Sequence, residues 1–186
     1  MPSNQKKNIP LLPLRGVIVY PTMLLHIDVG RERSVFAIEH ALANDHQVFL
    51  ATQMDLGLEN PEKEDLHRLG TLATIKSMTQ LPNGTYRVLI EGVQRAHWSA
   101  YQEADLYPVV NVQGYEEEQE KDAETEALMR TLIAQFKRYA KNSNRISDET
   151  VETVEGIQEA GRLADMIASN LPLKLSAKQE VLEMTD

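Results

Sequence analysis

The spacing of apolar side chains changes along this chain of 186 residues, from every second residue to every third or fourth. The change coincides with an acidic run at residues 116–122, which is too polar to enter a core. A period of two is typical of strands with one buried face, and a period near 3.6 is typical of amphipathic helices. We therefore predict a β domain over residues 1–115, an acidic linker over 116–124 and a helical subdomain over 125–186.

The first part is predicted to be a mainly antiparallel β domain with one or two helices. The dipeptide Asn83-Gly84 separates two strand-like stretches, 72–81 and 85–91. Asn-Gly is a strong hairpin signal because both residues tolerate a positive φ. Ser34 is a candidate cap for a helix whose apolar residues follow it with helical spacing. Further strands are predicted at residues 24–29, 47–52, 95–101 and 109–115, and an exposed loop at 54–68.

The second part is predicted to be a helical bundle. Leu128, Leu132 and Phe136 form an apolar stripe, which is more typical of a bundle core than of a binding groove. Ser147 is a candidate cap for a second helix, and Pro172 is expected to end a third. The overall fold class is therefore α+β, with the strands and the helices segregated along the chain.

The chain ends inside a predicted helix. Ser176 with Gln179 matches a capping box, which marks a helix start. The remaining residues are fewer than the ~12–15 that an isolated helix needs to be even marginally stable. We expect this helix to continue in a longer polypeptide.

Composition excludes several classes of protein and site. The formal net charge is −9, which disfavours nucleic-acid binding, and most of it lies after residue 115. The absence of cysteine excludes disulfides, thiolate zinc sites and cysteine nucleophiles. No apolar stretch approaches the ~20 residues of a membrane-spanning helix, and residues 9–14 are too short for a secretion signal.

The sequence contains no recognisable catalytic or metal-binding pattern. No glycine is followed by lysine, so a P-loop is excluded. His40 and His46 lie close in sequence but are more typical of surface histidines than of metal ligands. Glu149 and Glu152 lie in a solvated context, where a raised pKa is not expected. We predict no catalytic residue and no metal ligand in this chain.

Several motifs resemble the amino-terminal part of the ATP-dependent Lon proteases, and most closely those of Bacillus-like bacteria. The first is residues 9–16 (IPLLPLRG), followed directly by 17–21 (VIVYP). These matches cover nearly the whole chain in the order found in the family. The others are 28–31 (DVGR), 49–53 (FLATQ), 81–85 (LPNGT), 88–92 (VLIEG), 160–165 (AGRLAD) and 171–173 (LPL).

The resemblance implies a PUA-like β domain and a helical bundle, from which a long helix leads to an ATPase module and a serine-lysine protease module. Neither the Walker lysine nor the Ser/Lys dyad occurs here, so no catalytic residue is carried over and this fragment is not itself expected to be an enzyme. ATP and Mg²⁺ are expected only in the missing ATPase module. The implied role is substrate recognition and assembly within a cytoplasmic, hexameric protease that degrades misfolded and short-lived regulatory proteins.

An apolar patch is predicted as the substrate-binding surface. If the 83–84 dipeptide forms the whole turn, Met78 pairs with Leu89 on the face away from the core. Leu24 is expected to point outward from its own strand, with Pro21 in the preceding loop. We predict that these four residues bind unfolded or misfolded proteins. The alternative, given equal weight, is that the helical part or a neighbouring subunit covers them.

Other functions compatible with the sequence lead to different partners. The main alternative is a self-standing PUA-like adaptor module without ATPase or protease parts. Nucleic-acid binding, known for other PUA-like folds, is disfavoured by the charge. The resemblance implies a hexamer of the full-length protein. Exposed strand edges and a severed last helix would favour pairing of the fragment as a dimer.

Overall fold

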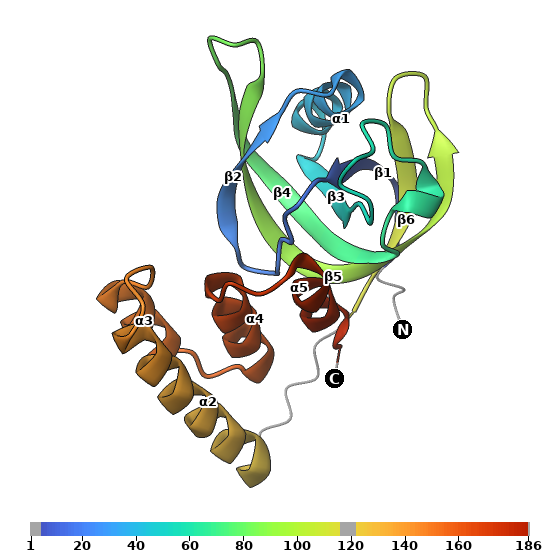
Figure 1. The fold of residues 1–186 in the computed structure, drawn as a ribbon. Coiled ribbons are helices and arrows are strands. Elements are labelled where there is room, and N and C mark those ends of the chain that lie inside the picture. The colour runs from blue at the N-terminus through green and yellow to red at the C-terminus, as the bar shows by residue number, and fades with distance from the viewer. Residues whose placement is uncertain (1–4, 116–121, 186) are drawn as a thin grey trace. The chain divides into compact units, whose positions relative to one another are not determined.

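The computed structural model describes residues 5–115 and 122–185, which form two compact units (Figure 1). The first unit ends at Tyr115, and the second extends to Met184. Most of the predicted acidic linker, residues 116–121, lies outside the described residues. Asp122 caps the first helix of the second unit by accepting a hydrogen bond from the Thr125 N–H, so residues 123 and 124 are helical rather than part of a linker.

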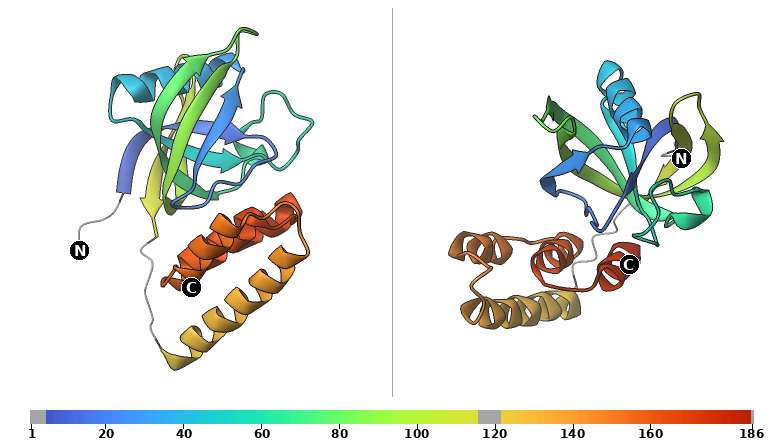
Figure 2. Two further views of the ribbon diagram at one scale, coloured as in Figure 1. Left: turned by 90° about the vertical axis from the view of Figure 1, so that its left-hand side faces the viewer. Right: turned by 45° about the horizontal axis from the view of Figure 1, so that its top comes forward.

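The first unit is a mainly antiparallel sheet in the order β2-β5-β4-β3-β1-β6. An additional pairing of β5 with β6 closes the sheet into a barrel (Figures 1 and 2). β1 and β3 run parallel, and the other pairs run antiparallel. The predicted α+β class is confirmed. The strands are β1 (Gln5–Leu14), β2 (Leu24–Val29), β3 (Gln47–Thr52), β4 (Leu69–Gln80), β5 (Tyr86–Glu103) and β6 (Pro108–Gly114).

β1 contains two prolines and was not predicted from the alternation of side chains. The Leu14 carbonyl accepts a hydrogen bond from the Gln53 N–H. In a parallel ladder the bonding groups alternate, so the backbone of Pro13 points to the other edge of β1. Proline is tolerated there because it has no N–H to leave unpaired.

β5 is a single strand where two were predicted. It passes through a bulge at Val93, because Gly92 pairs with Ala73 and Gln94 pairs with Leu72. A Cβ on Gly92 would lie 2.2 Å from the Tyr20 carbonyl oxygen, so this close approach requires glycine. The bulge lets one strand pair with β2 near its start and with β6 near its end.

One helix, α1 (Glu32–Ala43), packs on the barrel against β1 and β3. Its residues Ile38 and Ala41 are fully buried. Ser34 was predicted as its cap, and this was wrong. The helix begins at Glu32, three residues earlier than a Ser34 cap implies, after the extended backbone of Arg31, and Ser34 is buried in the first turn. Glu32 at the helix start is favourable for the helix dipole.

The hairpin between β4 and β5 has a longer turn than predicted. The Leu81 N–H donates to the Thr85 carbonyl at 2.8 Å, and the Gly84 N–H donates to the Leu81 carbonyl at 3.0 Å. Residues 82–84 therefore form a three-residue loop, and Gly84 has a φ of +85°. Asn83 Oδ1 accepts hydrogen bonds from the Thr85 backbone and hydroxyl. The prediction that residues 83–84 form the whole turn is therefore wrong by one residue.

The second unit consists of four helices around a small core. Ser147 caps α3 as predicted, accepting from the Thr150 N–H at 3.2 Å. α4 ends just before Pro172, also as predicted. The predicted capping box of Ser176 is wrong, because α5 begins after Lys174 with no side-chain cap. The helices are α2 (Ala123–Lys141), α3 (Asp148–Glu155), α4 (Ala160–Asn170) and α5 (Leu175–Glu183), and the core is Phe136, Val154, Ile157, Leu163 and Ile167.

The prediction of which side of α2 faces the core is partly wrong. Phe136 is buried at 3% exposure, but Leu128 is 64% exposed. Met129 and Ile133 pack against the core instead. α2 thus has more apolar residues than its buried face can hold, and the helical period does not say which of them face inward.

Candidate functional site

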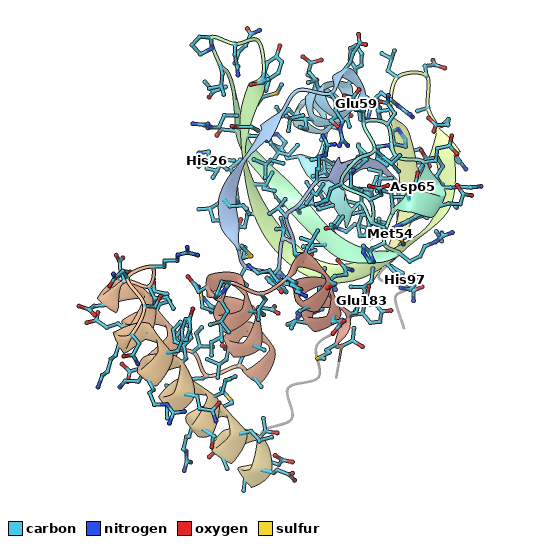
Figure 3. All side chains as sticks on the ribbon, viewed as in Figure 1. His26, Met54, Glu59, Asp65, His97 and Glu183 are labelled. Atoms are coloured by element: carbon cyan, nitrogen blue, oxygen red, sulfur yellow. The ribbon has the colours of Figure 1, made fainter. Side chains whose placement is uncertain are left out.

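The outer face of β2 and β5 brings together two of the four predicted substrate-binding residues. Leu24 lies opposite Glu91, and His26 lies opposite Leu89. Leu24 and Leu89 are therefore diagonal neighbours on one face of the pair. Leu24 is 60% exposed and Leu89 is half-buried. Figure 3 shows His26, the residue opposite Leu89, extending outward from β2.

Met78 does not share this face. It pairs with Val88 rather than Leu89 and packs against the barrel core. The three-residue turn causes the change, because it shifts the pairing by one position all the way from the turn to Ser77. A one-residue shift moves a side chain to the opposite face of a sheet. Ser77 occupies the place opposite Leu89.

Pro21 is buried and does not contribute to this surface. Its Cα lies 3.3 Å from where a Cβ on Gly92 would be, so it packs over the β5 backbone. Val93, at the β5 bulge two residues after Glu91, is a further apolar side chain, with 48% exposure. Val93 could not be predicted from the sequence, because the alternation of side chains does not reveal a bulge. We call Leu24, Leu89 and Val93 the outer patch.

Paired charges surround the outer patch. Arg87 donates two hydrogen bonds to the Asp28 carboxylate, at 2.9 and 3.0 Å. Lys76 forms an ion pair with Glu91 at 2.5 Å. The hydrogen bonds from Arg87 lower the pKa of Asp28 below 3.8, and those bonds also raise the pKa of Arg87. Each of these charged side chains already has a partner of opposite charge. The apolar side chains are therefore the groups on this face that are available to bind another protein.

Replacing Arg87 with alanine should raise the pKa of Asp28 towards its ordinary value. A carboxyl whose pKa is lowered in the folded state stabilises the folded protein above pH 3.8, and this stabilisation is lost as the pH falls through the folded-state pKa. The stability of the variant should therefore depend less on pH in that range. NMR titration of the Asp28 carboxyl carbon measures the shift. Lys76→Ala is the matched control, because it removes the neighbouring ion pair but should leave the Asp28 titration unchanged.

A groove of about 340 Å³ lies between β2 and the end of β1. Arg31 lies at this groove, where its Nη2 donates to Gln53 Oε1 at 2.7 Å. The Nη1 atom of Arg31 is buried and has no hydrogen-bond partner among the described residues. Burial, followed by the nearby charge of Arg15, lowers the pKa of Arg31. The groove therefore combines apolar walls with a partly unsatisfied cation.

Other candidate chemistry is not assembled in the parts of the chain that the structure describes. His40 lies against the Tyr107 ring, and His46 Nδ1 lies 3.3 Å from the Ile75 carbonyl oxygen. No three acidic or histidine side chains gather into a metal site within residues 5–115 and 122–185. Over the same residues, every helix is too short or too polar to cross a membrane.

Comparison with known proteins identifies relatives over the whole chain. The family model for the ATP-dependent protease La (LON) substrate-binding domain matches residues 8–186. Lon protease 1 of Bacillus subtilis (strain 168) is 52% identical over 186 residues, which cover 100% of this chain and 24% of that protein. Lon protease of Brevibacillus choshinensis is 51% identical, covering 96% of this chain and 23% of that protein. The chain thus spans about a quarter of the length of these curated relatives.

Solved structures share the fold. The N terminal domain of Mycobacterium avium complex Lon protease superposes with a TM-score of 0.75 at 23% identity, covering 97% of this chain and 91% of that one. The Lon N-terminal domain protein from Xanthomonas campestris gives a TM-score of 0.66 at 15% identity, covering 96% and 91%. With the family match over residues 8–186 and the identity to the Bacillus protein, these findings show that the chain belongs to the substrate-binding domain family of the ATP-dependent protease La (LON).

Proposed function

We propose that this chain is the substrate-recognition and assembly domain of an ATP-dependent Lon-type serine protease, which degrades misfolded and short-lived regulatory proteins in the cytoplasm. The family match over residues 8–186 carries this proposal. The protease would be a homohexamer, and its ATP, Mg²⁺ and Ser-Lys dyad would belong to the ATPase and protease modules of the longer polypeptide. The domain's own partners would be unfolded chains and further copies of itself.

The outer patch supports a role in binding unfolded proteins. Unfolding exposes apolar side chains, and Leu24, Leu89 and Val93 offer apolar surface among charges that are already paired. Burying one such side chain contributes roughly 1.5–3 kcal/mol before the cost of ordering the client. A single domain should therefore bind weakly, and simultaneous binding by several copies in a hexamer would strengthen the attachment.

The double variant Leu24→Ser/Leu89→Ser should bind an unfolded client about tenfold more weakly or worse, because it removes both neighbouring apolar side chains. Fluorescence anisotropy with a labelled, carboxymethylated, permanently unfolded protein measures the affinity, and circular dichroism checks the fold.

Met78→Ala is the matched control for this experiment, because Met78 faces the core. It should lower the stability while leaving the client affinity of the folded protein unchanged. An unaltered affinity in a folded Leu24→Ser/Leu89→Ser variant would remove the outer patch from the proposed function.

A further inference from the structure

β2 is an edge strand whose outer edge is open. Among the described residues it pairs with β5 alone. The hydrogen bond between Leu81 and Thr85 sets the alternation along β5: residues 85, 87 and 89 bond to β4, and residues 86, 88 and 90 bond to β2. It follows that the backbone N–H and C=O groups of Leu24, His26 and Asp28 point away from β5, towards the open edge.

This edge lacks the features that usually prevent strand addition. β2 has no proline, and its pairing with β5 runs without a register shift. Proteins normally protect open edges with proline, bulges or covering loops. The facing edge of β1 is protected in this way, because Pro13 has no N–H to offer. Of these two strand edges, the edge of β2 is the one that can form a full row of backbone hydrogen bonds with an added strand.

The groove lies beside this edge and has the size of a ligand site. Its volume of about 340 Å³ falls in the ~300–1,000 Å³ range of binding pockets. Leu12, Leu14 and Val17 contribute apolar side chains to its far wall. Arg15 and Arg31 contribute positive charge, and Asp28, the acidic residue in the lining, is already paired with Arg87 outside it.

We propose that the open edge of β2 and this groove bind an extended segment of an unfolded polypeptide as an added strand. The inference rests on the proposed function and specifies how a client is held. Unpaired backbone groups at strand spacing match another extended backbone and do not require a particular sequence. This suits a receptor for many different unfolded chains. The groove arginines, Arg15 and Arg31, favour a segment that also contains an acidic residue.

Two synthetic peptides separate backbone recognition from side-chain recognition. One alternates valine and threonine and carries a single aspartate; the other is identical but has every second backbone amide N-methylated. Added-strand binding predicts that N-methylation weakens the affinity for the 186-residue chain about tenfold or more, because several hydrogen bonds are lost at once. Equal affinity for both peptides would overturn the proposal.

Hydrogen exchange locates the binding site. The amides of Leu24, His26 and Asp28 should exchange quickly in the free protein and become protected when the unmethylated peptide binds. The Leu25 and Ile27 amides should be protected in both states, because they already bond to β5. Protection that appears elsewhere and not at the β2 edge would also overturn the proposal.

A pair of variants tests the edge directly. His26→Pro removes one outward N–H without removing a bond to β5, and His26→Ala keeps that N–H. His26→Pro should weaken peptide binding severalfold relative to His26→Ala. Equal binding by the two folded variants would contradict the proposal; if His26→Pro does not fold, the peptide pair and hydrogen exchange decide.

The outcomes distinguish this inference from the proposed function. If the unfolded protein binds but the two peptides do not differ, the strand mechanism fails and the proposed function stands. If neither the unfolded protein nor the peptides bind, the proposed function itself fails. Protection of the β2 edge that rises with protein concentration, without peptide, would assign the edge to a second copy of the chain and overturn the proposal.

Discussion

Replacing Gly70 with alanine should destabilise the barrel by about 3 kcal/mol or more, a large share of the ~5–15 kcal/mol that stabilises a typical folded protein. A Cβ at this position would lie 2.1 Å from the Leu50 carbonyl oxygen and 2.9 Å from Cζ of Phe49. The nearer atom is backbone within β3, and the Phe49 ring is fully buried. Neither can move aside without breaking the pairing of β3 with its neighbours.

Urea unfolding followed by Trp98 fluorescence measures this effect, because Trp98 is the sole tryptophan and is buried in the barrel. Gly84→Ala is the matched control: its Cβ meets nothing within 4 Å, but its φ of +85° makes a side chain unfavourable by roughly 1–2 kcal/mol. Equal losses for the two variants would show that the close approach at Gly70 is not decisive.

The strand pattern predicted from the sequence was correct where alternation alone decides the structure. Leu89 was expected on the face away from the core, and its two neighbours on the opposite face, Val88 and Ile90, are fully buried. The error arose at the hairpin, where the position of the turn was correct but its length was not. A loop of three residues in place of two put Met78 opposite Val88, on the inner face. Alternation does not contain this information, since turn length and bulges depend on how the strands pair.

The candidate site could be predicted only in part for the same reason. Leu24 and Leu89 were placed on the outer face because each follows the alternation of its own strand. Pro21 was misplaced because its burial depends on a contact with Gly92, far away in sequence. The groove could not be predicted at all. It forms between β2 and the end of β1, and the strands that lie beside a given strand are not visible in its own pattern.

The helical unit shows a different limit of sequence patterns. A period of 3.6 predicts that a segment is helical, and every helix expected after residue 122 is present. It does not fix the rotation of a helix that has apolar residues on more than one side. On α2, Leu128 and Phe136 belong to one continuous stripe by spacing, but packing against α3 and α4 selects the side that includes Phe136 and Met129. Tertiary contacts decide which of the alternative stripes is buried.

Substituting Phe136 with alanine should therefore cost about 3–5 kcal/mol, whereas Leu128→Ala should change the stability by no more than about 0.5 kcal/mol. Phe136 is 3% exposed in the small core of the helical unit, so its removal leaves a cavity that few neighbours can fill; Leu128 is 64% exposed and leaves none. Urea unfolding followed by circular dichroism at 222 nm measures both. A loss of about 2–5 kcal/mol for Leu128→Ala would mean that the stripe containing Leu128 is the buried one, as the sequence pattern predicted, and that the observed rotation of α2 is incorrect.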